Sequence, residues 1–246
     1  DTNIELFDNN EVFEEFEKRI IKNYDDSKLK SVSKYLKQLN NSSEKFRHFF
    51  ACIAWLYNYP IHDKKNPTKT YEIKEYLGEY YHEDLENIVF KYSGIASYGL
   101  LSQYIYYDIN FIYFFTKQYI TSKNNPHDII NNLDLYTLMK EISNEDFKNM
   151  QKLSSRHMLN YLFNPDIYEP IVDTSCKENI VKHYLNKVNK NTLDEDILSI
   201  RKNQIGFDVS LFDICKKSGI SKTVHILELE FEEKKDDFIV SLSSKN

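Results

Sequence analysis

The sequence predicts a mostly α-helical protein, a multi-helix globular domain with a small C-terminal β-hairpin or edge strand. Apolar residues recur every three or four positions over about the first two hundred residues, the spacing of a buried helix face. Only 5 glycines and 5 prolines interrupt the chain, which favours long helices. With 41% hydrophobic and 15% aromatic residues in 246, the chain has ample material for a core.

Three apolar stripes predict the first three helices, and each stripe must be buried against another helix. They are Val12, Phe13, Phe16 and Ile20; Leu29, Val32, Leu36 and Leu39; and Phe46, Phe49, Phe50, Ile53, Leu56 and Tyr57. Pro60 and Pro67 bracket a loop, after which the helical pattern continues over 73–89 with Gly78 as a stop.

Later helices are expected over 101–119, 126–142 and 144–163. Asn125 before Pro126 is a suitable N-cap, and Pro165 ends the third of these helices because proline lacks the amide and its ring clashes with the preceding turn. Capping boxes then predict two more helices, one opened by Ser175 with Glu178 and one by Thr192 with Glu195.

The last part of the chain has a different character. Residues 224–231 and 238–242 are β-prone and flank a charged stretch, which is typical of a hairpin or an edge strand. We therefore predict a helical domain over 1–220 and a β-prone appendage over 221–246, which would serve as a linker toward a missing motor domain if the chain is part of a longer protein.

Charge and cysteine content exclude several classes of protein. The net charge of −6 and a pI near 5.7 argue against a generally basic surface, although a local basic patch remains possible. Cys52, Cys176 and Cys215 include no CxxC pair, so neither a disulfide framework nor a zinc site is indicated, and Cys52 is expected in the core. No apolar stretch is long enough to span a bilayer, and we expect a cytoplasmic protein without membrane contact.

Four segments carry a family resemblance. They are 53–60, with the sequence IAWLYNYP; 94–99 followed by the aromatic stretch 109–115; 156–172, with the sequence RHMLNYLFNPDIYEPIV; and 193–201, with the sequence LDEDILSIR. In this order they resemble the N-terminal region of McrB-type AAA+ restriction and antiviral defence proteins, upstream of the GTPase or ATPase motor. The third segment is the longest and the most specific.

The resemblance implies a helical module that sits ahead of a nucleotide-driven ring and helps to choose the target. It implies an AAA+ motor domain or subunit and a nuclease as partners, possibly DNA, and homo-oligomers formed through the motor. This chain has no GxxxxGK[ST] sequence, so we expect no cofactor in it. It is therefore either a piece of a longer protein or a stand-alone relative.

The polar residues of the 156–172 segment have a structural interpretation and a functional one. Arg156 and His157 lie at the middle of the expected helix, and Asp166 and Glu169 lie in the loop beyond Pro165, so an ion pair across this turn is feasible. Tyr168 and Pro170 are expected to fold back onto the helix. A contact with a ligand or partner is the alternative. A PD…ExK nuclease site at Asp166 is disfavoured, because that chemistry needs carboxylates on adjacent strands.

Two groups of cations are candidate nucleic-acid contacts. Lys30, Lys34 and Lys37 fall at helical spacing opposite an apolar stripe, and a second group, Lys148, Lys152 and Arg156, repeats this spacing. Aligned cations could contact phosphates and would make the affinity depend strongly on salt. Any solvated helix face has the same arrangement.

No catalytic constellation is evident in the sequence. The seven histidines show no metal-ligand spacing, no thiol has a base at a recognisable distance in sequence, and no metal site is expected. The prediction is a non-enzymatic recognition or regulatory domain of a McrB-like system that binds DNA or a phage-associated signal. The alternative is a protein-interaction or oligomerisation scaffold that does not bind nucleic acid.

Overall fold

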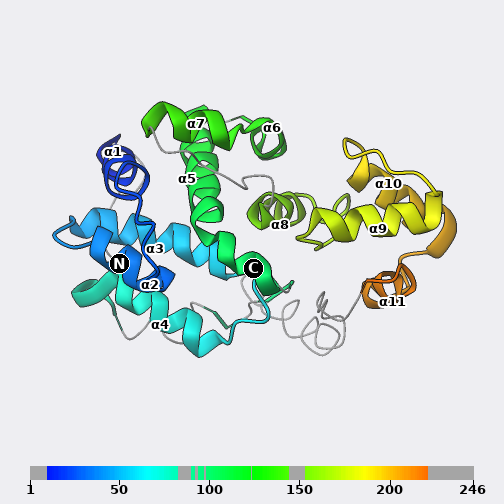
Figure 1. Ribbon diagram of the computed structural model, residues 1–246, viewed down its shortest axis with the longest axis horizontal. Helices are drawn as coiled ribbons and strands as arrows, with labels where there is room; N and C mark the ends of the chain where they lie inside the picture. Colours follow the sequence, from blue (N-terminus) through cyan, green and yellow to red (C-terminus); the bar gives the residue numbers. More distant parts are fainter. Residues whose placement is uncertain are drawn as a thin grey trace, which may run out of the picture.

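A computed structural model describes residues 10–82, 90–91, 94–96, 98–122, 124–143 and 153–220. The protein is mostly α-helical, which confirms the predicted fold class (Figure 1). The predicted β-prone tail, residues 221–246, lies outside the described residues, and so do Lys148 and Lys152 of the second cationic group. Within the described ranges, the β-structure is limited to one isolated bridge between Ile61 and Ala96.

The described residues form a series of α-helices along the chain. They are α1 (Asn10–Phe16), α2 (Ser31–Gln38), α3 (Glu44–Asn58), α4 (Asn66–Leu77), α5 (Ile105–Ser122), α6 (Pro126–Asn132), α7 (Leu135–Ile142), α8 (Ser154–Phe163), α9 (Thr174–Leu185), α10 (Leu193–Ile200) and α11 (Leu211–Lys217). A π-helical turn (Glu17–Ile21) follows α1 and another (Arg201–Ile205) follows α10, while short 3-10 turns occupy Gly78–Tyr80 and Gly99–Tyr104.

The larger hydrophobic core forms around α5, which is buried on every side from Asp108 to Phe115. Helices α3, α6 and α8 pack directly against it, and α1 and α4 pack against α3. The Phe16 ring stacks on Tyr113 with centroids 3.9 Å apart and meets Phe49 edge-on. Aromatic pairs of this kind contribute roughly 0.5–1.5 kcal/mol beyond their buried area. The aromatic-rich stripes predicted from the sequence therefore do meet one another.

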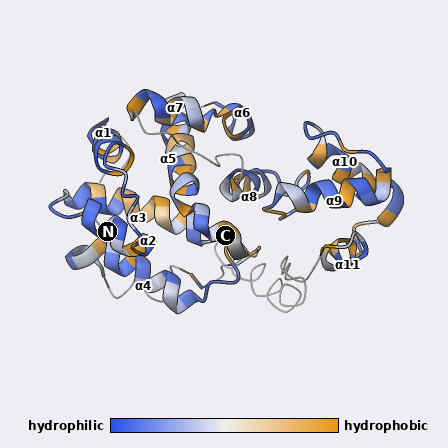
Figure 2. Cartoon of the chain, in the orientation of Figure 1, coloured by the Kyte–Doolittle hydropathy of each residue, from blue (hydrophilic) through white to orange (hydrophobic). Residues whose placement is uncertain are grey.

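A second, smaller hydrophobic core lies in α9, α10 and α11. Its buried members are Ile171, Cys176, Ile180, Val181, Leu193, Ile197, Ile200, Leu211, Ile214 and Cys215, none of which belongs to the larger core. In Figure 1 these three helices stand to one side of the rest, and Figure 2 shows apolar residues on the faces that they turn toward one another. We call them the α9–α11 lobe, and the helices from α1 to α8 the main lobe.

Helix ends follow the predicted capping chemistry in part. Asn125 caps α6 by accepting from the His127 amide at 2.9 Å, and α8 ends at Phe163 just before Asn164 and Pro165, as expected. The predicted helix over 126–142 is in fact two helices. Asp134 accepts from the Thr137 amide and starts α7 anew, so the chain turns after Leu133 without losing its apolar periodicity.

Other predicted details were wrong. Helix α9 begins at Thr174 with Asp173 as its cap, two residues before the predicted cap Ser175. Leu29 precedes α2 and is 43% exposed, because the helix starts only at Ser31. Cys52 was expected in the core and is exposed instead.

A buried acid lies at the centre of the main lobe. Asp108 of α5 is fully buried, and its Oδ1 accepts from the Ser155 amide at the start of α8, at 2.8 Å. Burial raises the pKa of Asp108 to about 7, and the hydrogen bond from Ser155 opposes this shift only in part. Its Oδ2 has no hydrogen-bond partner among the described residues. Asp108 thus joins two core helices, but its ionised form is disfavoured there.

This burial predicts an unusual pH dependence. Between about pH 4 and pH 7 the folded state holds the Asp108 proton more tightly than the unfolded state does, so the free energy of unfolding should fall as the pH rises through this window. The loss is at most about 4 kcal/mol, at about 1.4 kcal/mol for each pKa unit. Urea denaturation as a function of pH measures it.

In Asp108→Asn this slope should flatten, whatever the absolute stability of the variant. The exposed Asp128 provides the matched control, since Asp128→Asn should keep the slope of the unaltered protein. An identical slope in Asp108→Asn and the parent chain would show that Asp108 does not titrate in this range.

Candidate functional site

The predicted face of Lys30, Lys34 and Lys37 is only partly formed. Helix α2 begins at Ser31, so Lys30 is the extended residue before it and does not lie on the helix face as predicted. Lys34 Nζ donates to the Asp25 carbonyl at 2.8 Å, and Lys37 Nζ lies 4.0 Å from the Asp25 carboxylate. Asp25 therefore neutralises part of the positive charge of this face, which weakens it as a phosphate contact.

Arg156 was predicted to be a further cationic contact and is engaged inside the main lobe. Its Nη2 donates to the Leu133 carbonyl at 2.7 Å, and its guanidinium lies 5.1 Å from the centre of the Phe111 ring. Burial lowers its pKa, and the nearby Asp134 partly opposes this effect. This arrangement supports the structural interpretation of Arg156, since the guanidinium links α8 to the end of α6.

The 156–172 segment lies where the two lobes meet. Met158 and Leu159 are buried in the main core, whereas Ile171 belongs to the core of the α9–α11 lobe. Tyr168 folds back as expected, and its hydroxyl lies 3.0 Å from the His127 ring on α6. Pro165 and Asp166 are exposed in the turn, and Pro170 is half-buried.

The polar partners in this segment differ from the predicted ion pair. Glu169 pairs with Arg201 of the α9–α11 lobe at 2.7 Å, and His157 contacts Thr174 and Lys177 of α9 at 3.0 Å each. The segment therefore fastens one lobe to the other, and does not only lock its own turn.

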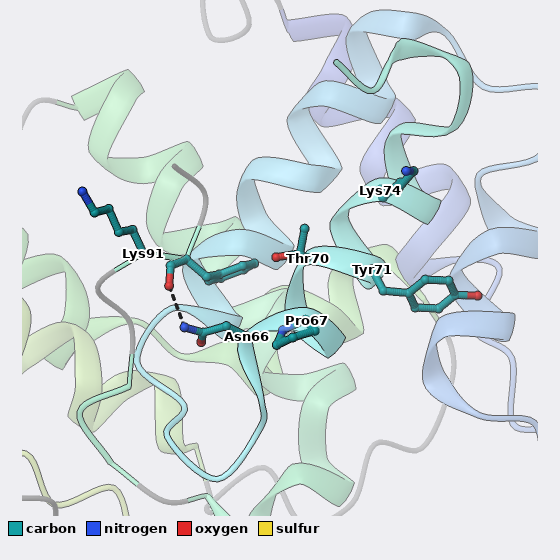
Figure 3. A pocket seen from close by; sticks show the side chains of 7 residues that line it. Asn66, Pro67, Thr70, Tyr71, Lys74 and Lys91 are labelled. Carbon is teal, nitrogen blue, oxygen red and sulfur yellow. Dashed lines mark hydrogen bonds between the residues drawn. The ribbon is translucent and has the colours of Figure 1, made fainter. Parts of the chain in front are cut away.

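A pocket among the described residues runs along α4. Its lining residues are Asn66, Pro67, Thr70, Tyr71, Lys74, Phe90 and Lys91, and we call it the α4 groove. Its volume of about 590 Å³ lies within the usual range of ligand sites. Five of its residues come from one face of α4, and the Asn66 amide holds the opposite wall by donating to the Phe90 carbonyl at 2.8 Å (Figure 3).

The charged side chains that line the groove are both lysines. Figure 3 shows Lys91 extending to one side of the groove and Tyr71 to the other, with Asn66 and Thr70 between them. Tyr71 is 54% exposed, so one face of its ring is available to solvent. Glu72, an acid on the inner side of α4, is paired with Lys64 at 2.5 Å.

A third lysine lies behind the groove floor. Lys69 is fully buried, and its ammonium lies 5.5 Å from the centre of the Phe90 ring. Burial lowers the pKa of Lys69 to about 8, with a further lowering by Lys64 that Asp63 opposes. At neutral pH most of this charge is retained, so it adds to the positive potential of the groove. The site suits an anionic ligand with a flat apolar part.

The sequence analysis missed this groove. A helical face that combines Asn66, Thr70, Tyr71 and Lys74 was visible as a spacing of three and four residues. The opposite wall comes from Phe90 and Lys91, which only tertiary structure brings to α4.

The described residues contain neither a cluster of metal ligands nor an accessible thiol with a lowered pKa. No group of three or more His, Cys, Asp or Glu side chains in these residues is placed to hold a metal ion. Cys176 and Cys215 are buried in the smaller core, and burial followed by the nearby Asp173 raises the pKa of Cys176 far above its usual range. Across the described residues, the helices are too short or too polar to cross a bilayer.

Comparison with known proteins identifies no relative: no family model, no curated protein and no solved structure matches this chain.

Proposed function

We propose that this chain is a non-enzymatic recognition module that binds DNA at the α4 groove and passes the binding event to an AAA+ motor. This is the role implied by its resemblance to the N-terminal region of McrB-type defence proteins. The motor and the nuclease would be separate domains or subunits, because this sequence has no P-loop. Such a module would work in the cytoplasm.

The observation that carries the proposal is the charge of the α4 groove. Lys74 and Lys91 lie on its two sides and Lys69 lies behind its floor, in a protein whose net charge is −6. A polyanion is repelled by most of such a surface, so a local concentration of cations decides where it can bind.

The shape of the groove favours an extended strand over a compact anion. Figure 3 shows Lys91 and Lys74 on different sides of the groove, an arrangement that a chain of phosphates can follow from one cation to the other. The exposed Tyr71 ring offers a stacking surface to an unpaired base, and such stacking contributes roughly 1–3 kcal/mol. Single-stranded or locally opened DNA therefore fits better than a closed duplex.

Fluorescence anisotropy tests the proposal with labelled single-stranded and duplex DNA, with and without base modification, from about 50 to about 200 mM salt. The parent chain should bind the single strand more tightly, and its affinity should fall as salt rises. Lys74→Glu combined with Lys91→Glu should weaken binding by at least about tenfold and reduce the salt slope by about 1 to 2 units. Tyr71→Ala should cost about five- to a hundredfold at every salt concentration.

The matched control is Lys30→Glu combined with Lys37→Glu, an equal charge change on the α2 face. It should leave most of the binding intact. If this control weakens binding and the groove variants do not, DNA binds at the α2 face instead. If the parent chain binds no DNA at low salt, the proposed function is wrong.

A second candidate function, a protein-interaction scaffold, is favoured by one exposed aromatic cluster. Tyr119 and Phe163 are 43% and 42% exposed, and both rings contact Phe115, at 5.9 and 5.5 Å between centroids. Clustered aromatic side chains are typical of the centre of protein interfaces.

The scaffold alternative predicts self-association through this cluster. Sedimentation velocity should then show concentration-dependent oligomers that Tyr119→Ser with Phe163→Ser converts to monomers. Tyr136, which is equally exposed but contacts only Lys140 of its own helix among the described ring and cation pairs, provides the control variant Tyr136→Ser. A parent chain that is monomeric at all concentrations would exclude this form of scaffold.

A further inference from the structure

The contact between the two lobes is narrow. The helix pairs with extensive contact in the described residues all lie within one lobe, and the two hydrophobic cores have no residue in common. In Figure 1 the chain passes from α8 into α9 and does not return to the main lobe before α11 ends. Apolar burial alone therefore holds the α9–α11 lobe only weakly in its position.

Polar and charged side chains form the contact between α8 of the main lobe and α9 of the other lobe. Lys177 of α9 is fully buried, and its ammonium donates to Asp194 of α10 at 2.5 Å and to His157 Nδ1 of α8 at 3.0 Å. On the other side of the imidazole ring, His157 Nε2 lies 3.0 Å from the Thr174 hydroxyl. The resulting chain of contacts, Asp194–Lys177–His157–Thr174, is called the latch below.

The latch fixes the protonation of its histidine. An ammonium group can only donate, so His157 Nδ1 must accept and Nε2 must carry the proton that is donated to Thr174. Burial of the ring is the main reason why the pKa of His157 lies well below its usual range. The charges of Lys177 and Arg156 lower it further. Burial also lowers the pKa of Lys177, while Asp194 and then Glu169 oppose this effect. The latch is complete when His157 is neutral.

We propose that the α9–α11 lobe is a hinged unit whose orientation on the main lobe is set by the Asp194–Lys177–His157–Thr174 latch, so that breaking the latch releases the lobe without unfolding it. The hinge lies in the segment 164–173 between α8 and α9, in which Tyr168 contacts His127 and Val172 belongs to the larger core. Arg201 holds Glu169 of this segment from within the lobe, and it also donates to the Val209 carbonyl at 2.5 Å. This internal bracing lets the lobe move as one body.

A hinged lobe can respond to a ligand that binds elsewhere on the chain. A ligand on the main lobe changes the lobe orientation only by as much as it prefers one orientation over the other. A buried polar contact between the lobes is suited to such a shift. It specifies one orientation of the α9–α11 lobe while adding little net stability to that orientation. This inference stands independently of whether DNA is the ligand.

Single-molecule energy transfer tests the hinge, with one dye on the exposed Cys52 of α3 and one on Gln204→Cys in the lobe. Cys176 and Cys215 are buried and should not react in the folded protein. The parent chain should give one narrow distance distribution. His157→Ala should broaden or shift it, while the far-ultraviolet circular dichroism should stay that of the parent.

Two further variants separate the latch from general damage. His157→Gln should restore the narrow distribution, because its side-chain amide can accept from Lys177 and donate to Thr174. Lys182→Met removes an exposed lysine from the same helix and should change nothing. An unchanged distribution in His157→Ala overturns the proposal. Loss of helical signal in that variant also overturns it, because the lobe would then depend on the latch for folding.

The latch also predicts a response to pH. The released state binds a proton on His157 more readily than the latched state does, since both ring nitrogens then donate and Lys177 no longer faces the ring at close range. Lowering the pH from 7 to 5 should therefore raise the released-to-latched ratio by up to about 25-fold, the limit for an ordinary histidine pKa of about 6.5 in the released state.

The same energy-transfer pair measures this ratio, and His157→Gln is the control that should show no such rise. The charged groups that act on the ring are Lys177 from the lobe and Arg156 from its own helix, and Asp194 and Glu169 act in turn on Lys177. A ratio that rises equally in His157→Gln and the parent would assign the effect to the carboxylates and overturn the role of His157.

Discussion

Lys177 is buried, and its side-chain nitrogen links α9 to Asp194 of α10 and to His157 of α8. An ammonium group removed from water is costly unless its hydrogen bonds and its charge are compensated. Asp194 supplies the opposite charge from within the lobe, and His157 supplies a further acceptor from the main lobe. Rotation of one lobe relative to the other would remove that acceptor, so the position of the lobe is specified by polar geometry.

The main lobe is organised by a different kind of contact. Around α5, aromatic rings from α1, α3 and α5 fill the interior, and Tyr113 adds a hydrogen bond to the Phe13 carbonyl at 3.1 Å. Close packing of this type resists displacement because each lost contact leaves a cavity. The α4 groove rests on this rigid part through Phe90 and Lys69. In this account, the proposed binding site lies on a fixed scaffold, and the proposed polar hinge carries a small lobe beside it.

Periodicity in the sequence was sufficient to predict most helices, because a helix that buries one face must repeat its apolar residues. It could not predict the break between α6 and α7, since Leu133 and Leu135 keep the pattern while Asp134 caps a new helix. Nor could it predict two cores, because an apolar stripe shows that a face is buried without showing against what. Leu29 followed the periodic pattern but lies before the first turn of α2.

Prediction of the candidate site was less successful, for reasons that lie in tertiary structure. The spacing of Lys34 and Lys37 was right, but the partial neutralisation by Asp25 depends on a loop that folds back onto the helix. The 156–172 segment was identified as structural from its proline and its apolar residues, whereas its charged partners, Arg201 and Lys177, come from the following lobe. The α4 groove has walls from two separate segments, which no local pattern links.

The central claim is that two separately packed helical units share one chain and meet at a polar contact. Native-state hydrogen exchange followed by mass spectrometry tests it most directly, since it measures the free energy at which each helix opens. The account predicts that α9, α10 and α11 open together, at a lower free energy than α3 and α5. Exchange of all these helices through one common opening, with the same denaturant dependence, would contradict it.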